Sequence, residues 1–364
     1  MKRAIQLFLL VAALAGVVLL QSGAVVEDNR IVLTHNPTGI MDTHVELTAV
    51  VAPGKKDQTT KALKDAEATL RKIEKLMSAH LADSDISKLN KAKANEEVPL
   101  SPQVLEVLTI ARDYNKATGG VFDITVRPLL EMWKAAGKAK KLPTDAQMKE
   151  AMDLVGWDKI KLSDKGATKL KDGVSVDLGG IAKKYAIDLA ADSLIKAGVE
   201  AGIVNIGGDI RVWGIPKNRG KWRIGVRHPF EKDDLIATMR VKEGAVATSG
   251  NYERFVVIDG KRYSHIVDPR TGKTADFVPS VTVTGKTAVG AGIWATALSV
   301  LGTDGYKLMT KEPGLEAMII TGGPKDYKFH YTDNFTTMMD EVPEEPATKP
   351  AATAVSDLGV RISD

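Results

Sequence analysis

Short runs in which apolar and polar residues alternate are spread along the chain, separated by segments with helical spacing. Val45, Leu47 and Ala49 alternate with polar neighbours, which predicts a strand over 44–51. The same pattern predicts strands over 203–206, 210–213, 222–227, 236–241, 253–258, 280–284 and 315–321. Because strands and helices are mixed without a regular strand–helix alternation, the pattern predicts an α+β architecture.

Apolar residues recur every three or four positions in several longer segments. This spacing predicts helices over 59–79, 104–118, 144–155, 181–197 and 292–301. Pro102 suits a first helical position, and Thr144 is a candidate cap for the helix that follows it. The stretch 134–141 is basic, and we expect it to be flexible.

Two apolar runs that end in paired glycines are the most informative part of the chain. Residues 174–178 alternate as in a strand and lead into Gly179 and Gly180, after which the spacing becomes helical. A second run, 203–206, leads into two further glycines and Asp209. Such junctions let backbone approach a ligand and direct helix N–H groups toward anionic oxygens. The two junctions therefore predict a nucleotide or phosphate site.

A predicted hairpin carries the chain's candidate base. A turn at 259–260 joins runs 252–258 and 262–267, so His265 falls on the return strand, with Asp268 and Arg270 in the next turn. A histidine close to a carboxylate and an arginine can place a general base beside an anion clamp. Alternatively, His265 is an ordinary strand residue, and Arg270 only pairs with Asp268 to hold the turn.

Composition and charge narrow the choice of function. The 364 residues are 44% hydrophobic and 26% charged, which is ordinary for a globular protein, and the net charge is +4. This small excess does not indicate nucleic-acid binding, for which a concentrated basic face is typical. Cysteine is absent, which excludes disulfides, thiolate catalysis, a cysteine zinc site and a lipid-modified cysteine.

The two termini differ from the rest of the chain. Lys2 and Arg3 precede an apolar run and a small-residue segment, so 1–24 is predicted to be a secretory signal peptide, with a retained membrane anchor as the alternative. Either would place the folded part in the periplasm or on the extracytoplasmic face of the inner membrane. The tail 341–364 is rich in Pro, Glu and Ala, and we expect it to be disordered.

Six motifs, taken together, resemble those of the ApbE family of FAD:protein FMN transferases. In chain order they read DSDISKLN, GGVFDITVRPLLEMW, DLGGIAKKYAID, VNIGGDI, TSGNYERF and KRYSHIVDPRTG. The resemblance implies one catalytic domain over 30–335, with the ApbE-like, T-fold-like arrangement of mixed sheets and flanking helices. It also implies an enzyme that uses FAD and Mg²⁺, transfers FMN to a threonine hydroxyl of a partner protein and releases AMP.

The resemblance further implies which kind of protein accepts the FMN and which other functions are possible. The acceptor would be a flavoprotein subunit of a membrane or periplasmic redox complex. A periplasmic FAD carrier with weak or lost transferase activity, or an FAD pyrophosphatase, is the alternative function.

Site residues follow from the same resemblance. His265 is implied as the catalytic base, and the Gly180 carbonyl and Thr296 as metal ligands. The implied flavin- or FAD-binding residues are Met41, His80, Val121, Phe122, Asp123, Asp177, Lys183, Ile266 and Arg270. The lysines at 183 and 184 can equally lie on a solvated helix face, and Asp123 or Thr125 can simply cap a helix.

The chain departs from the family pattern at the implied metal site. The family's metal-binding aspartate is Gly292 here, and Lys184 and Asp42 stand where glycine is usual. Without a carboxylate the site should hold Mg²⁺ less well. Asp209 or Asp268 can substitute, the FAD phosphates and water can hold the metal weakly, or catalysis is slow. Trp294 is a candidate to fill the space left at Gly292.

Overall fold

The computed structural model describes residues 28–217 and 220–346. The predicted signal or anchor at 1–24 lies outside the described residues, and so does the part of the predicted tail over 347–364. Residues 341–346 form neither helix nor strand. Within the described ranges, none of the helices combines the length and hydropathy that a membrane span requires.

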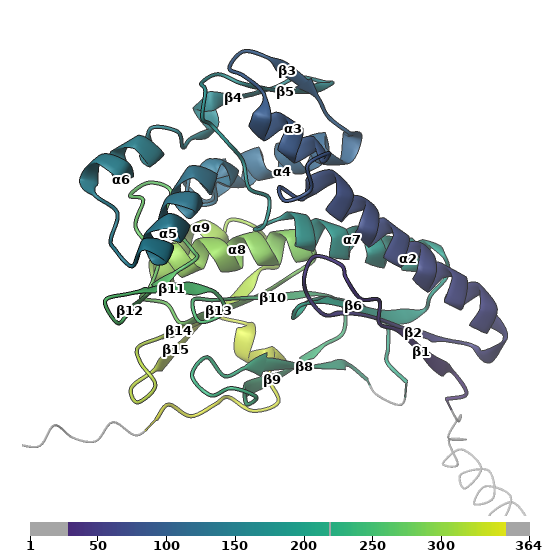
Figure 1. Ribbon diagram of the computed structural model, residues 1–364. Helices are drawn as coiled ribbons and strands as arrows, with labels where there is room; N and C mark the ends of the chain where they lie inside the picture. Colours follow the sequence, from purple (N-terminus) through teal and green to yellow (C-terminus); the bar gives the residue numbers. More distant parts are fainter. Residues whose placement is uncertain (1–27, 218–219, 347–364) are drawn as a thin grey trace, which may run out of the picture.

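An eight-stranded antiparallel sheet forms the centre of the molecule (Figure 1). Its strands, in spatial order, are β1 (Ile31–His35), β2 (Val45–Val51), β6 (Ala201–Ile206), β7 (Asp209–Trp213), β10 (Gly244–Gly250), β13 (Ser280–Gly285), β14 (Glu316–Thr321) and β15 (Lys328–Tyr331). Both faces of the sheet are covered. Successive side chains of a strand point to opposite faces, and in β10 Ala245 and Ala247 pack in one core cluster while Val246 packs in another. The mixture of sheets and helices confirms the predicted α+β class.

Three helices cover one face of this sheet (Figure 1): α2 (Lys56–Met77), α7 (Ala182–Lys196) and α8 (Ala288–Leu301). The predicted stripe of α2 is real, since Leu63, Leu70 and Ile73 are buried. The hairpin β8 (Trp222–Arg227) and β9 (Leu235–Val241) covers the opposite face.

Smaller elements complete the helical layer. A three-stranded sheet of β3 (Glu97–Pro99), β5 (Gly166–Lys169) and β4 (Ile160–Leu162) lies at the top of Figure 1, with α3 (Asp85–Lys91) and α4 (Pro102–Ala117) below it. The helices α5 (Arg127–Ala139) and α6 (Asp145–Met152) lie near the hairpin of β11 (Phe255–Ile258) and β12 (Lys261–Ser264), and the short α9 (Tyr306–Met309) follows α8.

The predicted strand over 174–178 is wrong, although its burial pattern is right. Val174, Val176 and Leu178 are buried, yet the segment is not part of a sheet. The side-chain amide of Asn90 replaces a neighbouring strand: its Oδ1 accepts from the Val176 N–H at 2.7 Å, and its Nδ2 donates to the Val176 carbonyl at 2.9 Å. One amide therefore satisfies both polar groups of this buried backbone.

One further expectation is corrected, and one central strand was missed. The stretch 134–141 was predicted to be flexible, but most of it belongs to α5. Gly137 there lets β11 approach closely, because a Cβ at this position would lie 2.6 Å from Val256. The central strand β10 was not predicted. It begins and ends with a glycine, and its pairing with β7 and β13 involves residues far away in the sequence.

Candidate functional site

The first glycine junction places backbone and an aromatic ring together at the start of α7. Asp177 Oδ1 accepts from the Gly179 N–H at 2.7 Å, and the Asp177 N–H donates to the Ile124 carbonyl at 2.8 Å. A Cβ at Gly180 would lie 3.0 Å from the Phe122 ring. The predicted segments 121–123 and 177–180 are therefore direct neighbours.

Two lysines of α7 face one buried carboxylate at the second glycine junction. Lys183 Nζ lies 2.7 Å from Asp209 Oδ2, and Lys184 Nζ lies 3.5 Å from the same oxygen. The Asp209 side chain is 4% exposed and that of Lys184 10%, so the solvated-face alternative is wrong for Lys184. Burial lowers the pKa of Lys184, and the charge of Asp209 opposes this shift.

The early segment 41–43 joins the same region. A Cβ at Gly207 would lie 2.5 Å from Thr43 Oγ1 and 3.4 Å from Lys183 Nζ. The Met41 N–H donates to Glu74 Oε1 at 2.7 Å, which ties the segment to α2. Asp42 has φ of 50°, a left-handed conformation that glycine adopts most easily and that aspartate tolerates.

His265 follows β12 and has a defined tautomer. The hairpin turn is as predicted, with positive φ at Asp259 and Gly260, but β12 ends at Ser264. His265 Nδ1 lies 2.9 Å from the Arg254 carbonyl oxygen. Because a carbonyl only accepts, Nδ1 carries the proton and Nε2 keeps the lone pair that can accept one.

The surroundings of His265 favour its neutral form. The residue reaches solvent, but the protein packed around it lowers the pKa of His265 by desolvation. The Arg254 carbonyl opposes that shift, and the positive charges of Arg254 and Lys184 reinforce it. Lys184, at the start of α7, is therefore one of the charges that act on His265.

The turn after His265 is held by an internal ion pair. Arg270 Nε and Nη2 lie 3.0 and 2.9 Å from the two oxygens of Asp268, which raises the pKa of Arg270. Trp133 Nε1 donates to the Gly272 carbonyl at 2.8 Å and fixes the turn to α5. The geometry supports the alternative in which Arg270 holds the turn.

Other predicted residues have structural partners or remain predictions. Asp123 Oδ1 accepts from Thr125 N at 2.8 Å, as a cap, and burial raises the pKa of Asp123. Ile266 is buried in the same core cluster as Val121 and Phe122. His80 is exposed in the turn after α2, where its N–H donates to Ser78 Oγ, and its flavin contact remains a prediction.

The donors at the implied metal site do not match Mg²⁺. Gly292 has no carboxylate, and Thr296 Oγ1 donates to the Gly292 carbonyl at 3.0 Å. Asp209 is paired with two lysines and Asp268 with Arg270. Among residues 28–217 and 220–346, no three His, Asp or Glu side chains are grouped so that they could hold a metal ion. Mg²⁺ prefers carboxylate oxygens, which this set lacks.

Lys184, and not Trp294, fills the space at Gly292. A Cβ at Gly292 would lie 2.5 Å from Lys184 Cε and 2.6 Å from its Cγ. Trp294 instead donates through Nε1 to Glu312 Oε2 at 2.7 Å. The sequence marked Lys184 and Gly292 as separate departures, and only the structure brings them together.

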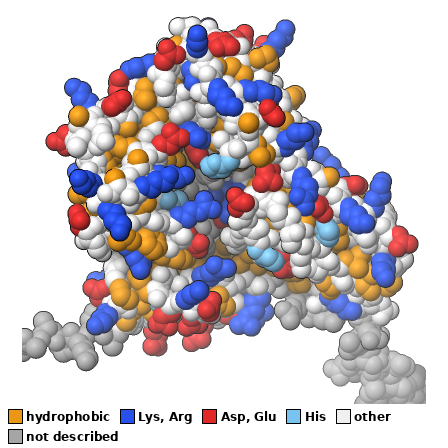
Figure 2. All heavy atoms as spheres, viewed as in Figure 1, with side chains coloured by type: hydrophobic (Ala, Val, Ile, Leu, Met, Phe, Trp, Pro, Cys, Tyr) orange, Lys and Arg blue, Asp and Glu red, His pale blue; other side chains and the backbone are white. Residues whose placement is uncertain are grey.

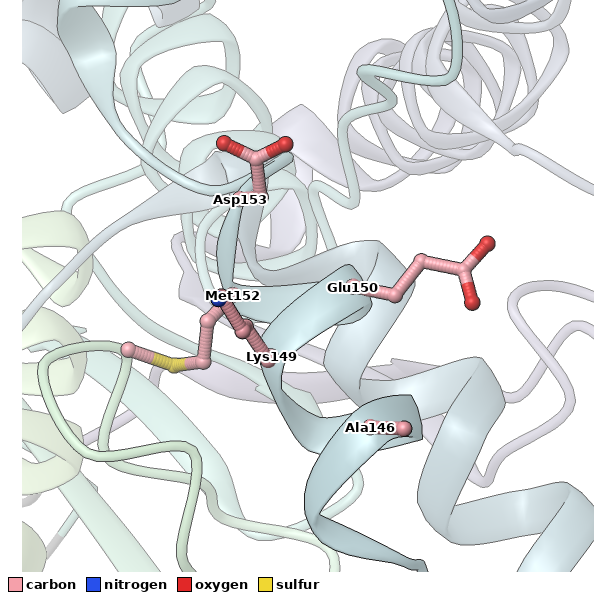
Figure 3. Close-up of a pocket in the computed structure, with 5 residues that line it drawn as sticks. All are labelled: Ala146, Lys149, Glu150, Met152 and Asp153. Carbon is pink, nitrogen blue, oxygen red and sulfur yellow. The ribbon is translucent and has the colours of Figure 1, made fainter.

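Two surface hollows have to be distinguished. Figure 2 shows one hollow near the middle of the molecule, with histidine, basic and acidic side chains around it. The other, in Figure 3, lies along α6 and is lined by Ala146, Lys149, Glu150, Met152 and Asp153. It is shallow, none of the predicted site residues line it, and Glu150 extends away from the helix. We therefore do not assign the site there.

Comparison with known families shows to which family this chain belongs. The model of the ApbE family matches residues 41–319. The chain belongs to the ApbE family. This match agrees with the resemblance carried by the six motifs.

Individual ApbE relatives cover most of the chain. The FAD:protein FMN transferase of Vibrio cholerae is 29% identical over 305 residues, 83% of this chain and 91% of that protein. That of Haemophilus influenzae is 32% identical over 254 residues, 67% of this chain and 73% of that protein. The fold is similar to solved ApbE structures from Thermotoga maritima (TM-score 0.75, 31% identity, 85% and 100% of the two chains) and Vibrio cholerae (0.74, 28%, 85% and 99%).

Proposed function

We propose that this ApbE protein transfers the FMN half of FAD to a threonine hydroxyl of an acceptor protein and releases AMP. Relatives named FAD:protein FMN transferase support this activity. The observation that carries it is the tautomer of His265: the proton on Nδ1 is held by the Arg254 carbonyl, and Nε2 can accept another. The glycine junctions supply backbone and lysines, which suits a diphosphate.

The chemical step is a phosphoryl transfer in which atoms and charges balance. The threonine oxygen attacks the phosphorus of the FMN half, and its proton passes to His265 Nε2. The bond between that phosphorus and the bridging oxygen breaks, and AMP leaves with the bridging oxygen. Lys183, 26% exposed and close to Gly207, stabilises negative charge on the diphosphate.

The flavin and the adenosine are expected on either side of this diphosphate. Met41, which packs partly buried against the core, and His80 are proposed to contact the isoalloxazine ring. Phe122 and Asp177 border the glycine junction and shape the site from the other side. Mg²⁺ is implied by the family resemblance, but because the donors do not match it, no step uses a metal.

The setting of the reaction is also part of this proposal. The predicted signal or anchor at 1–24 supports a periplasmic or extracytoplasmic location. The acceptor would then be a flavoprotein subunit of a redox complex at the membrane or in the periplasm. A periplasmic FAD carrier is the second candidate, favoured by the missing carboxylate at Gly292 and the lysine that fills its place.

Incubation of the purified protein with FAD and a candidate acceptor tests these functions. A transferase releases one AMP for each acceptor molecule that gains flavin. AMP and free FMN with an unmodified acceptor would indicate a pyrophosphatase. Bound FAD without AMP would indicate a carrier and would contradict the proposed transfer.

A further inference from the structure

Gly292 and Lys184 form a matched pair. A Cβ at Gly292 would lie 2.5, 2.6 and 3.0 Å from Cε, Cγ and Cδ of Lys184, closer than side-chain atoms pack. The clash involves the stem of the lysine rather than only its end, and the residue is buried. No side chain larger than hydrogen fits at 292 while Lys184 keeps this position. The lysine therefore occupies the space that a carboxylate at 292 would need.

The cluster around Lys184 carries an excess of positive charge. Lys183 and Lys184 both approach the same oxygen of Asp209, at 2.7 and 3.5 Å. One carboxylate balances only one of these two ammonium groups. A buried ammonium without a full counter-charge is costly, which is why burial lowers the pKa of Lys184. An anion bound beside this lysine favours the charged form, so the cluster favours binding of an anion.

The same arrangement disfavours a divalent cation. Asp209 is the buried carboxylate of this cluster, and two ammonium groups already contact it. An ammonium group a few ångströms from a metal repels it, and little solvent is present to screen the repulsion. By contrast, the diphosphate of FAD supplies the missing negative charge.

We infer that the Lys184 ammonium is a built-in cation that takes the place of the divalent metal beside the diphosphate, so that this protein binds FAD without Mg²⁺. Lys184 has this role only if FAD is the ligand, as in the proposed function. The Lys184 side chain is held in place by packing against Gly292 and by its ion pair with Asp209. It therefore needs none of the carboxylates that would ligate a metal ion. The lysine at 184 replaces the metal, and the glycine at 292 leaves the room that this lysine needs, so the two residues depend on each other.

Flavin fluorescence titrations with the full chain test this assignment. The wild type is expected to bind FAD with the same affinity, within about twofold, in EDTA and in excess Mg²⁺. Lys184→Met keeps the apolar stem and removes the charge, and should weaken FAD binding about 10- to 100-fold, as for loss of a charged hydrogen bond. Lys196→Met, at the exposed end of the same helix, is the matched control and should leave affinity unchanged.

A double variant tests the exchange of metal and lysine directly. Lys184→Gly with Gly292→Asp removes the clash and supplies a carboxylate, so Mg²⁺ or Mn²⁺ should tighten its FAD binding about tenfold or more. Wild-type binding that is lost in EDTA and restored by Mg²⁺ would overturn the inference and leave the proposed function intact. FAD affinity unchanged in Lys184→Met would also overturn it. A wild type that binds no FAD in either condition would contradict both.

Discussion

The imidazole of His265 is oriented by Arg254. Its Nδ1 and its backbone N–H lie 2.9 and 3.0 Å from the same carbonyl oxygen of Arg254. Both contacts join the two ends of the β11–β12 hairpin, so the ring is positioned by backbone and not by a carboxylate. The tautomer that a general base needs therefore depends on the hairpin being closed.

Replacement of His265 by alanine should remove the base and leave the FAD site. Because the ring accepts the threonine proton, His265→Ala should slow transfer about 10²- to 10⁴-fold, with FAD affinity within about twofold of the wild type. Single-turnover assays and fluorescence titration measure the two effects. His228→Ala, in the turn between β8 and β9, is the control. Transfer at the wild-type rate in His265→Ala would exclude the base role.

The rate of transfer should rise with pH as His265 loses its proton. Because desolvation and nearby positive charges lower the pKa of His265, the midpoint should lie below the ordinary imidazole value. Lys184→Met removes one of these charges, makes protonation easier and should move the midpoint to higher pH. Single-turnover rates from about pH 5 to 8 measure both profiles. An unchanged or lower midpoint in the variant would contradict an effect of the Lys184 charge on His265.

The packing of Lys184 on Gly292 predicts that the effect of Gly292→Ala on the free energy of unfolding changes sign when Lys184 is truncated. Alanine is a better helix former than glycine by about 1 kcal/mol, yet Gly292→Ala should lower the free energy of unfolding by about 1–3 kcal/mol because its Cβ meets the lysine. In a Lys184→Ala background the same change should be stabilising. Urea denaturation of the four proteins of this cycle gives the coupling. Additive effects would show that the two side chains do not compete for space.

Asp188 connects α7 to the start of α8. Its oxygens accept from the N–H groups of Ala288 and Val289 at 2.9 and 3.0 Å, and Arg211 Nη1 lies 3.0 Å from one of them. Asp188→Ala leaves these buried donors without a partner and should lower the free energy of unfolding by about 3 kcal/mol. Asp192→Ala is the control, because its ion pair with Arg211 is far more exposed; about 0.5 kcal/mol is expected there. Equal losses in the two variants would contradict the capping role.

Much of the fold follows from local signals in the sequence. The spacing of Leu63, Leu70 and Ile73 predicted α2, the candidate cap Thr144 predicted α6, and the turn at Asp259 predicted the β11–β12 hairpin. These signals are local, because each depends on residues a few positions apart. Where a partner comes from elsewhere in the chain, as Asn90 does for Val176, alternation alone predicted a strand that does not form.

The site could be predicted in part. The glycine junctions and the position of His265 were visible as motifs, and the structure brings the two junctions together through Lys183, which approaches both Asp209 and Gly207. The tautomer of His265 depends on the Arg254 carbonyl, and the role of Lys184 depends on the absence of a side chain at Gly292. Neither relationship has a signal in the spacing of residues, because both arise from tertiary contacts.

Intact-mass spectrometry of an acceptor protein incubated with FAD tests the central claim most directly. With the wild type, the acceptor should gain the mass of one FMN less one water, located on a threonine, in EDTA as well as in Mg²⁺. With His265→Ala the mass should stay unchanged although FAD is bound. An acceptor that stays unmodified by the wild type in both conditions, while FAD occupies the site, would contradict the account.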